Sequence, residues 1–283
     1  MGQVLFIVWR ESVEALLVVG VLYAWLKNGD HQARRGLPYL WAGVAIGLIA
    51  AIALGAALVG FTEMLSGAAQ DYFQTAIVLV ACVLIVQMVL WMKRHGRTLK
   101  RDMESSLQKS TQDEHWWGIA VLVALAIARE GSETTVFLYG VGFDQSGHVD
   151  ASQYLAIVVG FWLALLTFYL LQLGGKIFSW RSFFRVTEIM LLFLAAGLFE
   201  AGVDKLIDME VLPVIVNQVW NSSALLDDSS TFGSLVATLT GYRAHPAGMN
   251  LVAYAVYWIV IYLLLRRSNS QMAQKQKATS RPA

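Results

Sequence analysis

The stretch VWRESVEALL, residues 8–17, interrupts an apolar run with three ionisable side chains, Arg10, Glu11 and Glu14. The run extends from residue 4 to residue 26 and is otherwise suited to the hydrocarbon core of a membrane. Ionisable residues inside such runs are costly, and they usually have a function. The stretch therefore poses two linked questions: how the chain is organised around these side chains, and what they bind.

The composition indicates a membrane protein. Of the 283 residues, 57% are hydrophobic and only 14% are charged, whereas a soluble domain usually carries about 25% charged residues. The net charge of +1 gives no basic surplus that would favour nucleic acid as a partner. The single cysteine, Cys82, excludes an internal disulfide and a cysteine metal cage. The five histidines all lie outside the apolar runs, which argues against haem and against di-iron sites of the Glu-x-x-His type.

Seven apolar runs predict an all-α membrane protein with seven transmembrane helices, since about 20 apolar residues cross the hydrocarbon core. The first run is not a signal peptide, because it is too long and has neither a basic region before it nor a cleavage site after it. Gly43 and Gly47 form a GxxxG pair in the second run, which favours close helix packing. The seven runs cover residues 3–26, 37–61, 72–92, 116–140, 154–174, 183–206 and 250–265.

The distribution of Lys and Arg predicts the orientation, because loops on the cytoplasmic side are enriched in these residues. The second and fourth loops contain acidic residues and no base, and the sixth contains four acidic residues against Arg243. The alternation places the N-terminus outside and the C-terminus inside. The bases of the other loops are Lys27, Arg34 and Arg35, then Lys93, Arg94, Arg97, Lys100 and Arg101, then Lys176, Arg181 and Arg185, with Arg266, Arg267, Lys275, Lys277 and Arg281 in the tail.

A second stretch, AREGSETTVF at residues 128–137, repeats the charged motif with Arg129, Glu130 and Glu133. It lies three helices after the first copy, and an odd number of helices inverts the direction. At 1.5 Å per residue, Glu11 and Glu130 lie about 12 and 15 Å below the outer ends of their helices. Two copies of opposite direction at matched depth predict an inverted 3+3 repeat plus one C-terminal helix, with a site between the repeats.

The repeat defines the expected domain organisation. A single transmembrane domain would cover residues 1–265, followed by a basic cytoplasmic tail over residues 266–283. Within the domain we expect repeat one at about 1–92, repeat two at about 116–206, an outer loop at 207–247 and helix seven at 250–265.

The spacing of the motifs predicts a metal site. Residues at i and i+3 share one face of a helix, so each motif presents two carboxylates to the same side. Oxygen ligands select hard cations, and ferric iron is a natural candidate. The arginines would hold the carboxylates as ion pairs when no metal is bound, and the six groups together carry about two negative charges. The expected metal ligands are Glu11, Glu14, Glu130 and Glu133, with Arg10 and Arg129 as supporting ion pairs.

Other interpretations of the motifs stay open. The transported ion could be another metal, such as Mn²⁺ or Pb²⁺. Alternatively, the two Arg–Glu sets could hold two helices together in a structural subunit that binds no ligand. Two copies at matched depth favour a ligand. An intramembrane enzyme that uses carboxylates as acid and base is disfavoured, because no transmembrane His or Lys could activate Ser12 or Ser132. We therefore expect a transporter and not an enzyme.

A further acidic set lies at the outer end of the sixth helix. Glu200, Asp204 and Asp208 are spaced at i, i+4 and i+8 and so share one face. They could form an outer vestibule that concentrates cations, or they could be solvated residues of a helix end. Asp71 and Glu63 in the second loop could join the same vestibule.

At the Arg-Glu-x-x-Glu motifs the chain resembles the oxidase-dependent iron permeases, the high-affinity iron permease family of fungi and bacteria. The usual family motif is Arg-Glu-Gly-Leu-Glu, and here the two copies are RESVE and REGSE. The segments AAGLFEAGV and FGSLVATLTGY also look like parts of the bacterial members. Many relatives carry a glutamate early in the third helix, where this chain has QDYFQT with Asp71 and Gln74.

The resemblance implies an iron permease of the bacterial inner membrane. Iron would be the transported substrate, delivered as Fe³⁺ after a partner has oxidised Fe²⁺, and no cofactor would be bound permanently. The implied partners, besides the membrane lipid, are periplasmic: an iron-binding or copper-containing component, or a peroxidase. Some relatives are associated with lead.

Overall fold

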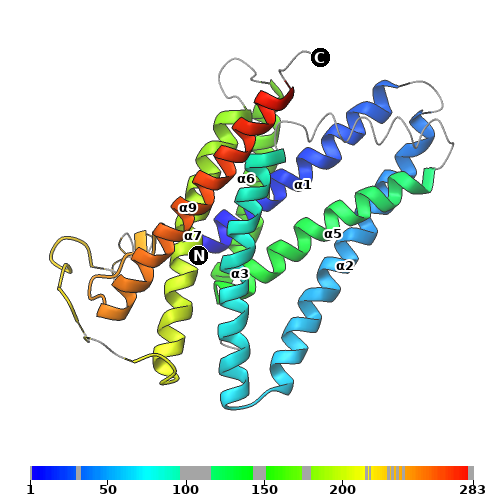
Figure 1. Ribbon diagram of the computed structural model, residues 1–283. Coiled ribbons are helices and arrows are strands. Elements are labelled where there is room, and N and C mark those ends of the chain that lie inside the picture. The colour runs from blue at the N-terminus through cyan, green and yellow to red at the C-terminus, as the bar shows by residue number, and fades with distance from the viewer. Residues whose placement is uncertain are drawn as a thin grey trace. The chain divides into compact units, whose positions relative to one another are not determined.

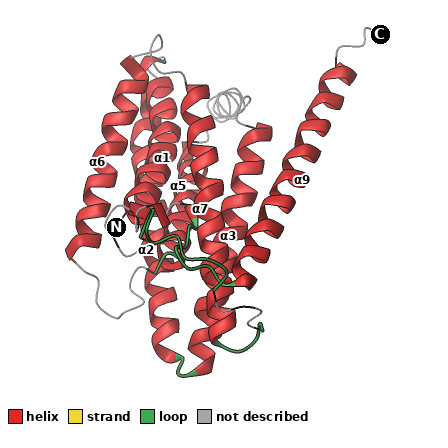
Figure 2. Ribbon diagram, turned by 90° about the vertical axis from the view of Figure 1, so that its left-hand side faces the viewer, coloured by secondary structure: helices red, strands yellow, loops and turns green. Residues whose placement is uncertain are grey.

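A computed structural model describes most of the chain, and all of its regular structure is helical. The described residues are 2–29, 33–95, 116–142, 151–173, 180–213, 218–227 and 240–279, together with 216, 230, 233, 236 and 237. Over these ranges there is no β-strand (Figure 2). The helices are α1 (Gly2–Asn28), η1 (Ala33–Gly36), α2 (Leu37–Met64), α3 (Ala68–His95), α5 (Trp116–Gly140), α6 (Ala151–Leu173), α7 (Trp180–Asp208) and α9 (Gly248–Thr279), as Figure 1 labels them.

Each of the seven predicted apolar runs forms a long helix. The largest difference in bounds is at the last helix, which continues as α9 to Thr279, whereas the apolar run ends at residue 265. By length and composition, five helices can cross a membrane: Ala33–Met64, Ala68–Lys93, Ala151–Gln172, Ser182–Asp208 and Gly248–Gln271. The other two, α1 and α5, have 27 and 25 residues and carry the charged motifs.

Several loop charges used to predict the orientation lie outside the described residues. These are Arg97, Lys100, Arg101, Asp144, Asp150, Lys176, Asp228 and Arg281.

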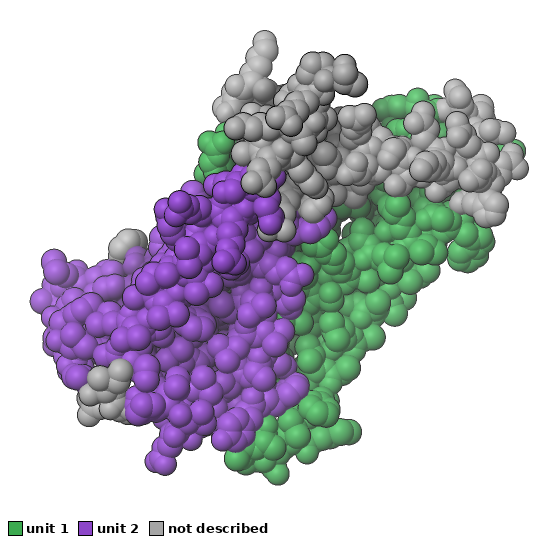
Figure 3. Space-filling model, viewed as in Figure 1, with its two compact units in different colours: residues 1–70, 98–187 green, residues 71–97, 188–283 purple. Residues whose placement is uncertain are grey.

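The chain divides into two compact units (Figure 3). Unit 1 contains residues 1–70 and 98–187, and unit 2 contains residues 71–97 and 188–283. Unit 1 holds α1, α2, α5 and α6, and therefore both charged motifs. Unit 2 holds most of α3 and α7 together with α9.

In unit 1, helices of the first predicted repeat pack against helices of the second. Helix α1 packs against α6, α2 packs against α5, and α1 also contacts α5. Apolar side chains fill the α1–α2–α5 contact, where they are removed from solvent and lipid alike. This core contains Val18, Leu22, Leu26, Leu40, Ile119, Val123 and Ile127.

Glycines allow the helices of unit 1 to approach closely. A Cβ atom on Gly43 would lie 2.5 Å from the carbonyl oxygen of Ala120, and one on Gly47 would lie 2.7 Å from Cβ of Ile127. The predicted GxxxG pair therefore faces α5. On α6, a Cβ on Gly160 would lie 2.9 Å from the carbonyl oxygen of Leu5 on α1. In both pairs a glycine supplies the space that the backbone of the partner helix fills.

Unit 2 is held by small residues and by aromatic side chains with polar tips. A Cβ on Gly202 of α7 would lie 2.5 Å from the side chain of Leu79 on α3, so these two helices also pack closely. The Tyr257 hydroxyl donates a hydrogen bond to the Leu192 carbonyl at 2.7 Å, which joins α9 to α7. Cys82 is buried, in line with a packing role.

The close approach of α2 and α5 predicts that Gly43→Ala lowers stability. The added methyl group would meet backbone, which cannot rotate away, so we expect a loss of about 1–3 kcal/mol. Gly60→Ala is the matched control on the same helix, because a Cβ there meets nothing within 4 Å. It should be neutral or stabilising by up to about 1 kcal/mol. Thermal unfolding of the purified variants in one detergent measures both, and equal melting temperatures would contradict the packing described here.

Candidate metal centre

Helix α1 buries an arginine between two glutamates. Arg10 is 1% exposed and Glu11 is 2% exposed. Nη1 of Arg10 lies 2.7 Å from Oε1 of Glu11, and its Nη2 forms an ion pair with Glu14 one turn further along. The i, i+4 spacing allows the second pair, since residues four apart are neighbours on a helix surface. One guanidinium group thus holds both carboxylates of the first motif.

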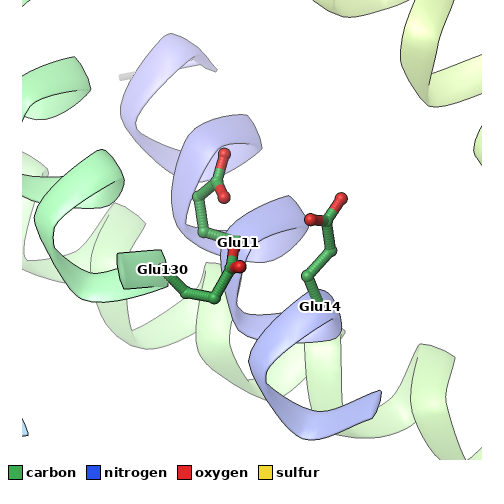
Figure 4. A group of neighbouring side chains, drawn as sticks. All are labelled: Glu11, Glu14 and Glu130. Atoms are coloured by element: carbon green, nitrogen blue, oxygen red, sulfur yellow. The ribbon is translucent and has the colours of Figure 1, made fainter. Parts of the chain in front are cut away.

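Helix α5 adds a third carboxylate to this cluster. Figure 4 shows Glu11 and Glu14 on α1 with Glu130 reaching toward them from α5. One carboxylate oxygen from each of the three lies within 4.8 Å of the others. The contact between α1 and α5 therefore brings the two motifs together within unit 1.

Glu133, the fourth predicted ligand, lies beside this cluster with a different partner. Its Oε1 accepts a hydrogen bond from Nε of Arg129 at 2.9 Å. It still exerts an electrostatic effect on Glu14, so the two carboxylates are neighbours. The two motifs are unequal in their surroundings, because the Arg129 side chain is 42% exposed whereas that of Arg10 is 1% exposed.

Buried carboxylate oxygens in this centre lack hydrogen-bond donors. Among the described residues, Oε2 of Glu11, Oε2 of Glu130 and Oε2 of Glu133 are buried and accept no hydrogen bond. Buried polar atoms in native proteins are nearly always satisfied, and exceptions indicate a functional group, a water or an ion. Full charges on the four glutamates and two arginines add up to about −2, so the centre has both the charge and the free oxygens to bind a cation.

The dimensions of the cluster suit a hard cation. Oxygens that bind a small hard cation lie about 2.1 Å from it and hence at most about 4.2 Å from each other. The 4.8 Å limit for the three carboxylate oxygens is close to that size. If each carboxylate oxygen shifted by less than about 1 Å, which side-chain rotations allow, all three oxygens would lie within coordination distance of one cation. Carboxylate oxygen is the ligand type that hard cations select.

The predicted outer vestibule residues lie in unit 2, except Glu63, which is exposed at the end of α2 in unit 1. Asp71 is exposed at the start of α3, and Asp208 is exposed at the end of α7. Glu200 is buried and Asp204 is partly buried, one turn apart on α7. Gln74, which lies in the part of the third helix where relatives carry a glutamate, is buried and accepts a hydrogen bond from Lys205 at 3.3 Å.

Sequence reasoning missed the partners of Asp204. Its Oδ2 lies 2.6 Å from Nη2 of Arg243, and its Oδ1 accepts a hydrogen bond from Nδ2 of Asn250 at 2.6 Å. The signal available in the sequence was that Arg243 is the one Lys or Arg among the acidic residues of the loop over residues 207–247. Nothing in the sequence indicated that Asn250, in the first turn of α9, would face α7.

Comparison with known proteins identifies the class. The model of the Iron permease FTR1 family matches residues 1–268, and the chain belongs to this family of iron permeases, which are transporters and not enzymes. The Ferrous iron permease EfeU of Escherichia coli O6:K15:H31 is 28% identical over 255 residues, covering 89% of this chain and 91% of that protein. The Ferrous iron permease EfeU of Yersinia pestis is 25% identical over 272 residues, covering 94% and 95%.

No solved structure matches the chain. The resemblance inferred from the motifs is confirmed by the family match, as are iron transport and a membrane location. The roles of the individual motif residues stay predictions.

The burial difference between the two arginines predicts unequal effects of their removal. Arg10→Met would leave two carboxylates in a buried site without their shared counter-charge, at an expected cost of about 3–5 kcal/mol. Arg129→Met removes an arginine that is 42% exposed and leaves the mostly buried Glu133 without it, at a smaller expected cost of about 1–2 kcal/mol. Thermal unfolding in detergent compares the two variants. Equal destabilisation would show that the second arginine is as important to the fold as the first.

Proposed function

We propose that the chain moves iron inward across the bacterial inner membrane through its two Arg-Glu-x-x-Glu motifs. The observation that carries this proposal is the cluster of Glu11, Glu14 and Glu130, contributed by two helices and holding buried oxygens without hydrogen-bond donors. Glu133 would complete the ligand set. The family match supports iron as the substrate, and the relatives named above are called ferrous iron permeases.

An arriving cation would compete with the arginines for the carboxylates. Arg10 pairs with Glu11 and Glu14, and Arg129 pairs with Glu133, so three of the four carboxylates are held in place before metal arrives. A multivalent cation releases these ion pairs and compensates the net charge of about −2. A monovalent cation would compensate it only in part, which gives a physical basis for selectivity.

The proposal includes oxidation of the substrate outside the membrane. Ferrous iron would be oxidised by a periplasmic partner, which is an iron-binding or copper-containing component or a peroxidase, and Fe³⁺ would reach the carboxylates. Fe³⁺ is the harder of the two ions, and an all-oxygen ligand set favours it.

The proposed topology has seven transmembrane helices with the N-terminus outside and the C-terminus inside. The packing between helices of the two predicted halves supports an inverted 3+3 repeat. Helix α1 packs on α6 in the same way as α5 packs on α2, and α3 packs on α7. In such a repeat the first helix of one half meets the second helix of the other. This topology places Asp71 and Asp208 on the outer side, where they would raise the local cation concentration.

Iron uptake tests the metal centre. In an iron-transport-deficient cell that also expresses the oxidase partner, Glu14→Gln and Glu130→Gln should each lower radioactive iron uptake by roughly tenfold or more, because each removes a ligand charge. Glu63→Gln is the comparison variant, since it removes the charge of an exposed glutamate at the end of α2, outside both motifs, and its effect should be much smaller. Expression in the membrane is matched by immunoblot.

The form of iron offered separates the outcomes of this uptake experiment. Uptake of Fe²⁺ that needs the partner, with uptake of Fe³⁺ that does not, is the expected pattern. Uptake unchanged in both motif variants would overturn the carboxylate mechanism. Uptake of Mn²⁺ or Pb²⁺ in place of iron would reassign the substrate.

Cysteine labelling tests the topology. In a Cys82→Ser background, Ser66→Cys lies in the described turn between α2 and α3 and should react with a membrane-impermeant maleimide from outside the cell. Asn28→Cys, at the C-terminal end of α1 and before α2, should react only after the membrane is permeabilised. The reverse pattern would place the N-terminus inside.

A further inference from the structure

A second polar cluster lies in unit 2, where the outer loop meets α7 and α9. Asp204 of α7 is its centre, with Nη2 of Arg243 at 2.6 Å from Oδ2 and Nδ2 of Asn250 at 2.6 Å from Oδ1. Asp204 is 39 residues from Arg243 and 46 residues from Asn250 in the sequence, so the fold brings α7 to the other two residues.

Asn250 brings an unused oxygen into this cluster. Its side chain is 4% exposed, and its Oδ1 is buried without a hydrogen-bond partner. The amide cannot be turned to use this oxygen on Asp204, because two acceptors would then face each other. With Nδ2 fixed on the carboxylate, Oδ1 remains a buried carbonyl-type oxygen without a hydrogen-bond donor, which is an atom type that can bind a cation.

Glu200 adds a second carboxylate one turn before Asp204. It is 4% exposed, and the two residues are spaced i, i+4 on one face of α7. Asp204 repels its charge and Arg243 attracts it, so all three groups act on one another. A buried glutamate beside an aspartate is costly unless positive charge compensates it, and Arg243 is 45% exposed and thus free to leave toward solvent.

We propose that Glu200, Asp204 and Asn250 form a second binding site for a hard metal cation, with Arg243 as the positive group that the cation displaces. Two carboxylates and one amide oxygen are the ligand types that hard cations prefer. When Arg243 swings away, Oδ2 of Asp204 becomes available together with Oδ1 of Asn250. Arg243 also belongs to the outer loop, so cation binding releases a contact between that loop and α7.

The alternative is that the cluster only fastens the outer loop and α9 to α7. The two interpretations differ in the effect of Arg243. A fastening role makes its removal destabilising and irrelevant to metal, whereas a displaceable counter-charge makes its removal favourable to metal binding.

The experiment measures ⁵⁵Fe²⁺ binding by anaerobic equilibrium dialysis of the purified full chain in detergent. The background carries Glu11→Gln, Glu14→Gln, Glu130→Gln and Glu133→Gln, so that binding which remains is independent of the proposed transport motifs. A parallel series keeps the motifs intact and follows the loss of total stoichiometry, in case the background does not fold. The variants are Glu200→Gln, Asp204→Asn, Arg243→Gln and the control Arg267→Gln, an exposed arginine of α9.

The expected result is about one Fe²⁺ retained per chain in the motif-free background, weakened roughly tenfold or more by Glu200→Gln or Asp204→Asn. Arg243→Gln should tighten binding up to about fivefold, because it removes a competing half-exposed ion pair, and Arg267→Gln should leave it unchanged. No retained binding in the background together with no lost stoichiometry in the parallel series would overturn the proposal. Arg243→Gln that lowers the melting temperature without tightening binding would do the same. Neither result would bear on the uptake test of the motifs.

Discussion

The structure of unit 1 depends on the buried contact of Arg10 with Glu11 and Glu14. A guanidinium group that is 1% exposed must be paired, and two adjacent carboxylates could not stay ionised there without it. The contact also restricts the rotation of α1 about its own axis, because the charged side of α1 has to be covered. That side meets α5, and α5 places Glu130 beside the two carboxylates. Packing and ligand placement are thus two results of one electrostatic requirement.

The glycines of α2 and α6 complement this requirement with space. Gly43, Gly47 and Gly160 let the helices approach until backbone atoms meet. In a membrane, where burial of apolar surface contributes little to helix association, such close contact is a main source of stability. Helix α1 also contacts α5 directly, and this contact brings Glu130 beside the carboxylates of α1.

Much of the fold could be predicted from the sequence, because a membrane-spanning helix leaves a long apolar run. The same argument found both motifs, since charged residues stand out against that background, and it placed Glu11, Glu14 and Glu130 on faces that could meet. It could not find the Arg243–Asp204–Asn250 contacts, which join a loop to two helices and leave no periodic pattern. Sequence reasoning also could not show that Arg129 is far more exposed than Arg10. The two motifs have the same pattern of charged residues and differ in what packs around them. The continuation of α9 from residue 266 to Thr279 was not predicted, because this part of the helix is polar and lies outside the apolar run.

The length of α9 has a mechanical consequence. At 1.5 Å per residue its 32 residues extend about 48 Å, whereas the hydrocarbon core is about 30 Å thick. The apolar part gives way to Arg266 and Arg267, which are exposed and suited to lipid phosphates at the membrane surface. In the proposed topology, residues 268–279 therefore continue the helix by about 18 Å past these two arginines, beyond the part of α9 that the hydrocarbon core can cover.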